Sequence, residues 1–184
     1  MIMDLNELRD KAYKASCEKG FHEEDLGDDT YLMLVICELA EAVEADRKGK
    51  VGLKSKRLFE MDYNYFPDLE KEEKRFKYSF EKHVKDTLPD ELADTVIRLL
   101  DLAGLRGIDL SDIYVWDFIT MKDFPVYTFA IIGRLHDIPI ERAVVSAISN
   151  VFSYCKVANI DLLWHIEQKM KYNELREYKH GKRY

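Results

Sequence analysis

Two long stretches of the chain repeat their apolar residues with the period of an α-helix, and this pattern constrains the fold most. In residues 31–48 the apolar positions with helical spacing are Leu32, Val35, Ile36, Leu39 and Val43, and in residues 91–105 they are Leu92, Val96, Leu99 and Ala103. Glycine and proline are scarce, and only residues 113–118 are ambiguous between strand and coil. The sequence therefore predicts a single all-α domain over residues 1–184, built as a helical bundle.

Cap and stop residues place the remaining helices. Asp4 or Asn6 can cap a first helix that runs to about Lys19. The capping-box pattern with an early proline at 87–90 opens the helix over 91–105, which Gly104 and Gly107 end. Further helices are predicted near 125–136, 140–158 and 161–176, followed by a basic tail. Residues 50–86 change from basic to aromatic to charge-rich, and we interpret them as an insertion with one short helix, serving as a lid or a contact surface.

Composition excludes several classes of function. The net charge is −7 and the sequence pI is about 5.3, so the chain has no general attraction for nucleic acids or membrane surfaces, and we expect neither as a partner. The three cysteines form no CxxC pair and no disulfide framework. No apolar run approaches the roughly 18 residues of a spanning helix, and no export signal is recognisable. We expect a soluble cytoplasmic protein.

The strongest chemical signal is a pair of carboxylates on each of two helices. Residues three apart lie about 60° apart around a helix, so Glu38 and Glu41 share one face, and Glu91 and Asp94 share another. Two such pairs on facing helices can surround a hard divalent cation with oxygen ligands and leave room for water and phosphate. The alternative is that each pair belongs to a solvated acidic face.

The neighbours of the first pair favour the metal interpretation. Leu34 and Ala45 share its face and Cys37 lies close by, which places the carboxylates in a crevice where their charge needs neutralising. The second pair is less telling, because Asp90, Arg98 and Asp101 continue a polar stripe that is typical of surface, with an Asp94–Arg98 ion pair of little energetic value.

With both pairs placed, the sequence resembles the MazG-like all-α nucleoside triphosphate pyrophosphohydrolases, a group that includes dimeric dUTPases and phosphoribosyl-ATP pyrophosphohydrolases. The residues that carry the resemblance are the ExxE segment 38–45, the ExxD segment 91–94 with the run to Gly107-Ile108-Asp109-Leu110, and the closing segments 169–176 and 179–182. Two departures are Cys37, where many members carry another glutamate, and a longer gap between the two pairs.

The resemblance implies a magnesium-dependent enzyme, with manganese as a substitute, that cleaves a nucleoside triphosphate to the monophosphate and pyrophosphate. The implied metal ligands are Glu38, Glu41, Glu91 and Asp94, and Glu41 or Glu38 would accept the proton of the attacking water. Substrate contacts are expected from Lys169, Asn173, Arg176 and Lys179. The expected assembly is a homodimer.

The second half of the chain aligns with the first without gaps. Residues 127–138 lie on 31–42, and residues 145–162 lie on 93–110. In this register Arg134, Asp137, Ala143 and Ser146 stand where the first half has its four carboxylates. We interpret 125–184 as a candidate degenerate repeat plus the basic tail, which would leave one working half and allow a monomer. Coincidence between amphipathic helices is the alternative, and superposition of the two helix pairs distinguishes them.

Three other functions stay open at this point. The same site suits a phosphoribosyl-ATP substrate, and a nucleotide-binding regulatory relative without turnover would share the fold. A di-iron carboxylate bundle needs Glu-x-x-His on two helices, whereas residues 177–180 supply one such motif, located in the tail.

Overall fold

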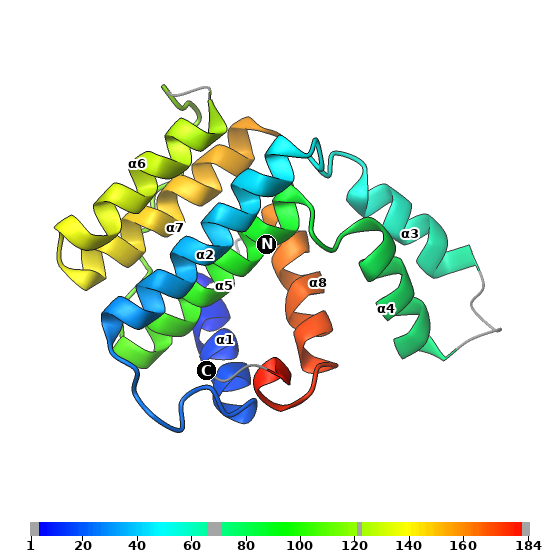
Figure 1. Cartoon of the computed structure of the whole chain (residues 1–184), viewed down its shortest axis with the longest axis horizontal. Helices are drawn as coiled ribbons and strands as arrows, with labels where there is room; N and C mark the ends of the chain where they lie inside the picture. The colour runs from blue at the N-terminus through cyan, green and yellow to red at the C-terminus, as the bar shows by residue number, and fades with distance from the viewer. Residues whose placement is uncertain (1–3, 66–70, 121–122, 182–184) are drawn as a thin grey trace.

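The computed structural model describes residues 4–65, 71–120 and 123–181, and its regular structure there is entirely helical (Figure 1). The all-α prediction is confirmed. The elements are α1 (Leu5–Glu18), α2 (Asp28–Arg47), α3 (Ser55–Tyr65), α4 (Glu72–His83), α5 (Leu88–Arg106), α6 (Phe124–Asp137), α7 (Ile140–Val157), α8 (Leu162–Glu174) and the 3₁₀ segment η1 (Tyr178–Gly181). Residues 113–118, ambiguous in the sequence, form no strand.

Helix α5 lies at the centre of the bundle. It packs against α2, α1, α8 and α7, and α6 joins through contacts with α7 and α2 (Figure 1). Val96, Leu99 and Ala103 have no exposed surface, as expected for a helix that is covered on most of its circumference. Arg106 at the end of α5 bonds Asp28 at the start of α2, so the two helices run antiparallel.

Most predicted helix ends are observed, but one predicted mechanism is wrong. The Asp4 side chain accepts a hydrogen bond from the Asn6 backbone N–H and caps α1, and Gly107 ends α5 in the left-handed region at φ 65°. Thr87 stands at the N-cap of α5, yet its hydroxyl donates to the Val84 carbonyl instead of capping the helix. The predicted capping box is therefore absent at this helix end.

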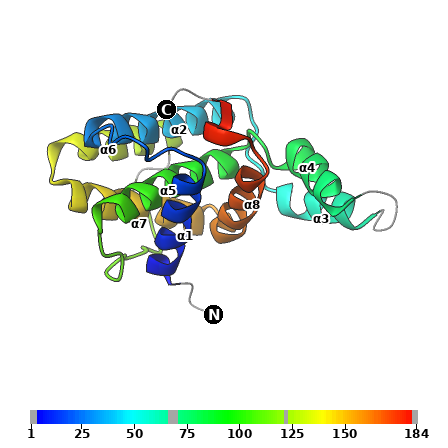
Figure 2. The same ribbon diagram turned by 90° about the horizontal axis from the view of Figure 1, so that it is seen from below.

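The insertion contains two helices where the sequence analysis predicted one. Helices α3 and α4 form a hairpin that projects to one side of the bundle (Figures 1 and 2). Its core is a cluster of buried aromatic and apolar side chains that α8 completes: Phe59, Phe76, Phe80, Val84 and Tyr172. The prediction missed the second helix because charged residues surround the aromatic positions of 72–83, which hides their helical spacing.

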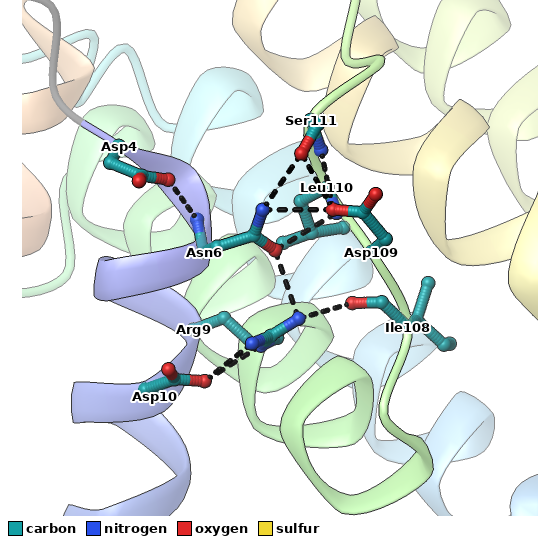
Figure 3. A network of polar contacts seen from close by, with 8 residues as sticks. All are labelled: Asp4, Asn6, Arg9, Asp10, Ile108, Asp109, Leu110 and Ser111. Carbon is teal, nitrogen blue, oxygen red and sulfur yellow. Dashed lines mark hydrogen bonds and ion pairs between the residues drawn. The ribbon is translucent and has the colours of Figure 1, made fainter.

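A polar network fastens the segment after α5 to the start of α1 (Figure 3). The Asn6 side chain donates to Asp109 and accepts from the Leu110 backbone N–H, while Arg9 donates to the Ile108 carbonyl. These bonds satisfy main-chain groups of a turn that has no regular partner. They also fix α1 against the segment that follows α5, and both helices line the cleft described below.

Helix starts agree with the proposed internal repeat. Helices α2 and α6 begin at Asp28 and Phe124, with the same offset that aligns Tyr127 with Tyr31. Helices α5 and α7 begin at Leu88 and Ile140, again in the proposed register. The two pairs, α2 with α5 and α6 with α7, each pack together.

The ends of α5 and α7 share the left-handed C-terminal geometry that is common at helix ends. Gly107 and Asn159, equivalent in that register, have φ values of 65° and 56°. The next residues, Ile108 and Ile160, donate to the carbonyls of Ala103 and Cys155 over 2.9 and 2.8 Å. Asparagine is the non-glycine residue best suited to this left-handed position. Because Gly20 and Gly49 end α1 and α2 in the same way, this match does not by itself distinguish a repeat from coincidence, and superposition remains the test.

Among the described helices, none is by itself long and apolar enough to cross a membrane. Helices α7 and α8 meet that length and composition criterion only together, across a bend of 116°.

Candidate functional site

A cleft of about 800 Å³ lies among α1, α2, α5 and α8, and the four predicted carboxylates line it. Its volume falls within the range of small-molecule and cofactor sites. Helices α2 and α5 supply its acidic wall, while α1, α8 and the segment around Arg176 supply basic residues. The carboxylates predicted from distant parts of the sequence therefore share one cavity.

Three of the four carboxylates converge. One oxygen each from Glu38, Glu91 and Asp94 lies within 4.8 Å of the others. Glu38 and Glu91 are buried and Asp94 is half-buried. Glu41 lines the same cleft but is exposed and lies outside this close group. The predicted four-ligand set is thus represented by a compact trio with Glu41 at its edge.

The antiparallel packing of α2 on α5 explains the convergence. Val35, Leu39 and Ala42 bury one side of α2 completely, which turns Glu38 toward α5 across the packed interface. Glu91 and Asp94 lie in the first two turns of α5, one turn apart on the same face. The apolar pattern that forms the core therefore also orients these carboxylates toward one another.

Two cationic side chains reach into the trio. The Arg98 Nε donates to Glu38 Oε1 over 2.5 Å, so Arg98 bridges the two helices instead of pairing with Asp94 as the sequence suggested. The Lys169 ammonium lies 2.6 Å from Asp94 Oδ2 and 2.8 Å from Asp90 Oδ2. Both cations offset part of the acidic charge.

The remaining charge still perturbs the acids. Burial, with Asp90 and Asp94 nearby, raises the pKa of Glu91 to about 8. Burial and then the charge of Asp94 also raise the pKa of Glu38, although Arg98 opposes this shift. Buried like charges of this kind are stabilised by a cation, and an all-oxygen donor set suits a hard one such as Mg²⁺ or Mn²⁺. The residues present therefore fit a divalent ion.

The four predicted substrate contacts differ in position. Lys169, Asn173 and Arg176 line the cleft, and the Asn173 Oδ1 atom is buried without a hydrogen-bond partner among the described residues. Lys169 is committed to two carboxylates in this structure. Lys179 is not among the lining residues, and its ammonium pairs with Glu23 over 2.9 Å. The sequence could not show this partner, because Glu23 lies far away along the chain.

Sequence reasoning missed two sets of residues at this site. Asp90 was assigned to a surface stripe, yet it has no exposed surface and bonds Lys169. Several lysines also line the cleft without having been singled out: Lys11, Lys14, Lys19 and Lys85. The position of Asp90 in the first turn of α5 could have indicated its role, because backbone N–H groups orient carboxylates there. Its side chain accepts a hydrogen bond from the Asp86 backbone N–H.

Comparison of the chain with protein-family models, with curated proteins and with solved structures finds no significant match.

Proposed function

We propose that the chain is a magnesium-dependent nucleoside triphosphate pyrophosphohydrolase. The observation that carries the proposal is the convergence of Glu38, Glu91 and Asp94 within 4.8 Å in a cleft that also has a basic side. A divalent ion held by these carboxylates would neutralise charge on phosphate oxygens and lower the pKa of bound water. The family resemblance of the sequence motifs supports the same reaction.

The basic side of the cleft suits a polyphosphate. Lys11, Lys14, Lys85 and Arg176 line it and provide positive charge in the same cleft as the acidic residues. Charge-assisted contacts from such groups bind phosphate strongly inside a partly enclosed site. The acidic side of the cleft would bind the ion, and the basic side would bind the substrate.

Glu41 is the better of the two candidates for accepting the proton of the attacking water. It is exposed to the cleft, whereas Glu38 is buried and its Oε1 atom is occupied by Arg98. A general base must reach the water it deprotonates, and an accessible carboxylate beside the ion meets that requirement. Glu38 then serves as a ligand.

The test is release of pyrophosphate from each standard ribo- and deoxyribonucleoside triphosphate, and from phosphoribosyl-ATP, with and without Mg²⁺. We expect a nucleoside monophosphate and pyrophosphate as products, and loss of turnover in E38Q and D94N with the fold retained. The matched control is E44Q, on the same helix but outside the cleft, where Glu44 is half-buried and pairs with Arg47. Magnesium-dependent turnover at the wild-type rate in D94N would refute the assignment of that ligand.

A second candidate is a nucleotide-binding protein without turnover. The observation that favours it is that Arg98 and Lys169 already pair with two of the three converging acids. Nucleotide binding that does not require Mg²⁺, without release of pyrophosphate from any substrate tested, would support this candidate over the enzyme.

A further inference from the structure

Lys169 has an unusual setting for a substrate-binding lysine. It is only 6% exposed, and its ammonium lies between Asp90 and Asp94 at 2.8 and 2.6 Å. Asp90 is fully buried and has a second bond, from the Asp86 backbone N–H over 3.0 Å. One partner of the ammonium is therefore a candidate metal ligand, and the other is a carboxylate outside the converging trio.

The two carboxylates have different consequences for a cation at the trio. The positive charge of Lys169 repels a divalent ion and competes with it for Asp94. Asp90 opposes this effect, because it attracts the same ammonium away from Asp94 and cancels its charge. The rigid position of Asp90, fixed by burial and by the helix start, makes it an anchor for the lysine side chain.

We propose that Lys169 is a resident counter-ion of the metal site and competes with a bound divalent cation for Asp94. Asp90 is the positioning residue that limits this competition. The inference rests on the proposed function, because it concerns the same metal site. It adds a link between ligands: a polyphosphate that takes up the charge of Lys169 removes the repulsion, so ion and nucleotide strengthen one another's binding.

Charge alone predicts opposite effects for the two halves of the pair. D90N leaves the ammonium to Asp94 and weakens divalent-ion binding roughly tenfold, the change that about 1.4 kcal/mol produces. K169M removes the repelling charge and strengthens binding roughly tenfold. The double variant D90N/K169M removes both charges and returns the affinity to near the wild-type value.

The experiment is calorimetric titration of the full chain with Mn²⁺ alone, without nucleotide, on wild type and the three variants. The matched control is K171M, two residues along α8, because Lys171 is more exposed, pairs with Glu72 and does not line the cleft. Circular dichroism establishes that each variant is folded. If K169M does not fold because Asp90 is left buried without its partner, the comparison of D90N with D90N/K169M carries the test: removal of the ammonium must still tighten binding.

Weaker Mn²⁺ binding in both D90N and K169M would overturn the proposal, because a purely structural role of the pair predicts that result. Absence of Mn²⁺ binding in every variant would overturn it as well. A second measurement repeats the titrations of wild type and K169M with a saturating nucleoside triphosphate that carries a non-hydrolysable α,β-bridge. The nucleotide is expected to tighten Mn²⁺ binding by a larger factor in wild type than in K169M. If the Mn²⁺ pattern holds while no pyrophosphate is released, the counter-ion inference stands and the proposed reaction fails.

Discussion

Replacing Glu91 with glutamine should make the folded chain more stable while removing its metal site. Glu91 is 5% exposed, and its burial, together with the charges of Asp90 and Asp94, raises its pKa to about 8. Its folded pKa exceeds the unfolded value of 4.5, so the folded chain holds the proton between these values and loses stability as the pH rises through that window. E91Q keeps the shape of the side chain and removes the charge.

The pKa difference limits the size of the effect. In full, a rise from 4.5 to about 8 corresponds to roughly 5 kcal/mol of destabilisation above pH 8. Because the carboxyl lines the cleft, where solvent screens its charge, we expect about 2 kcal/mol. The assay is urea denaturation in the presence of a chelator at pH 5 and pH 8, comparing wild type, E91Q and the control E44Q, whose glutamate lies outside the cleft.

Two results are expected together. E91Q should gain stability over wild type at pH 8 and much less at pH 5, and E44Q should stay within about 0.5 kcal/mol of wild type at both. Added Mg²⁺ should stabilise wild type by about 2.7 kcal/mol at a hundredfold excess over its dissociation constant, but not E91Q. A lower stability of E91Q at pH 8 in chelator would refute the argument that these acids repel one another in the fold.

Burial lowers the pKa of His165 to about 4, so the unfolded chain takes up the proton first and acidification from pH 7 to 4 should cost up to about 3 kcal/mol; H165F should flatten this dependence in denaturation curves. Gly20 has φ 81°, and an added Cβ would lie 2.2 Å from the Tyr178 ring. G20A should therefore lower the free energy of unfolding by about 1–3 kcal/mol, and limited proteolysis should cleave the C-terminal segment faster than in wild type. Phe80 is fully buried, so F80A should lose about 3–5 kcal/mol of unfolding free energy, whereas Y78A, at an exposed position of the same helix, should lose under about 1 kcal/mol.

The fold was accessible from sequence wherever apolar spacing and end signals agree. The helices around Leu39 and Leu99 were predicted because their apolar faces are long and continuous, and such faces must be buried in a bundle. The α3–α4 hairpin was missed in part because its stability depends on α8: Tyr172 stacks on Phe80 at 4.5 Å between ring centroids. A contact between such distant residues leaves no local pattern.

In the candidate site, too, local patterns were predictable from the sequence and long-range contacts were not. Glu38, Glu91 and Asp94 were found from their spacing, because position on a helix face follows directly from the helical repeat. Their charge partners were not found. Arg98 reaches Glu38 across an interface and Lys169 reaches Asp94 from α8, and each depends on how whole helices pack. Of the four acids predicted from the sequence, three converge and Glu41 lies at their edge, and the structure was needed to show what compensates them.

Compensation also explains why an internal repeat would keep only one site. In the proposed register the equivalents of Glu38 and Glu41 are Arg134 and Asp137, both exposed, while the position of Glu91 holds the buried Ala143. A buried acid is tolerated on α5 because α8 packs against that helix and supplies Lys169. Helix α7 has no such neighbour among its main contacts, which are α5 and α6. Alanine at position 143 retains the packing without the cost of a buried acid, and arginine at position 134 replaces one of the converging carboxylates.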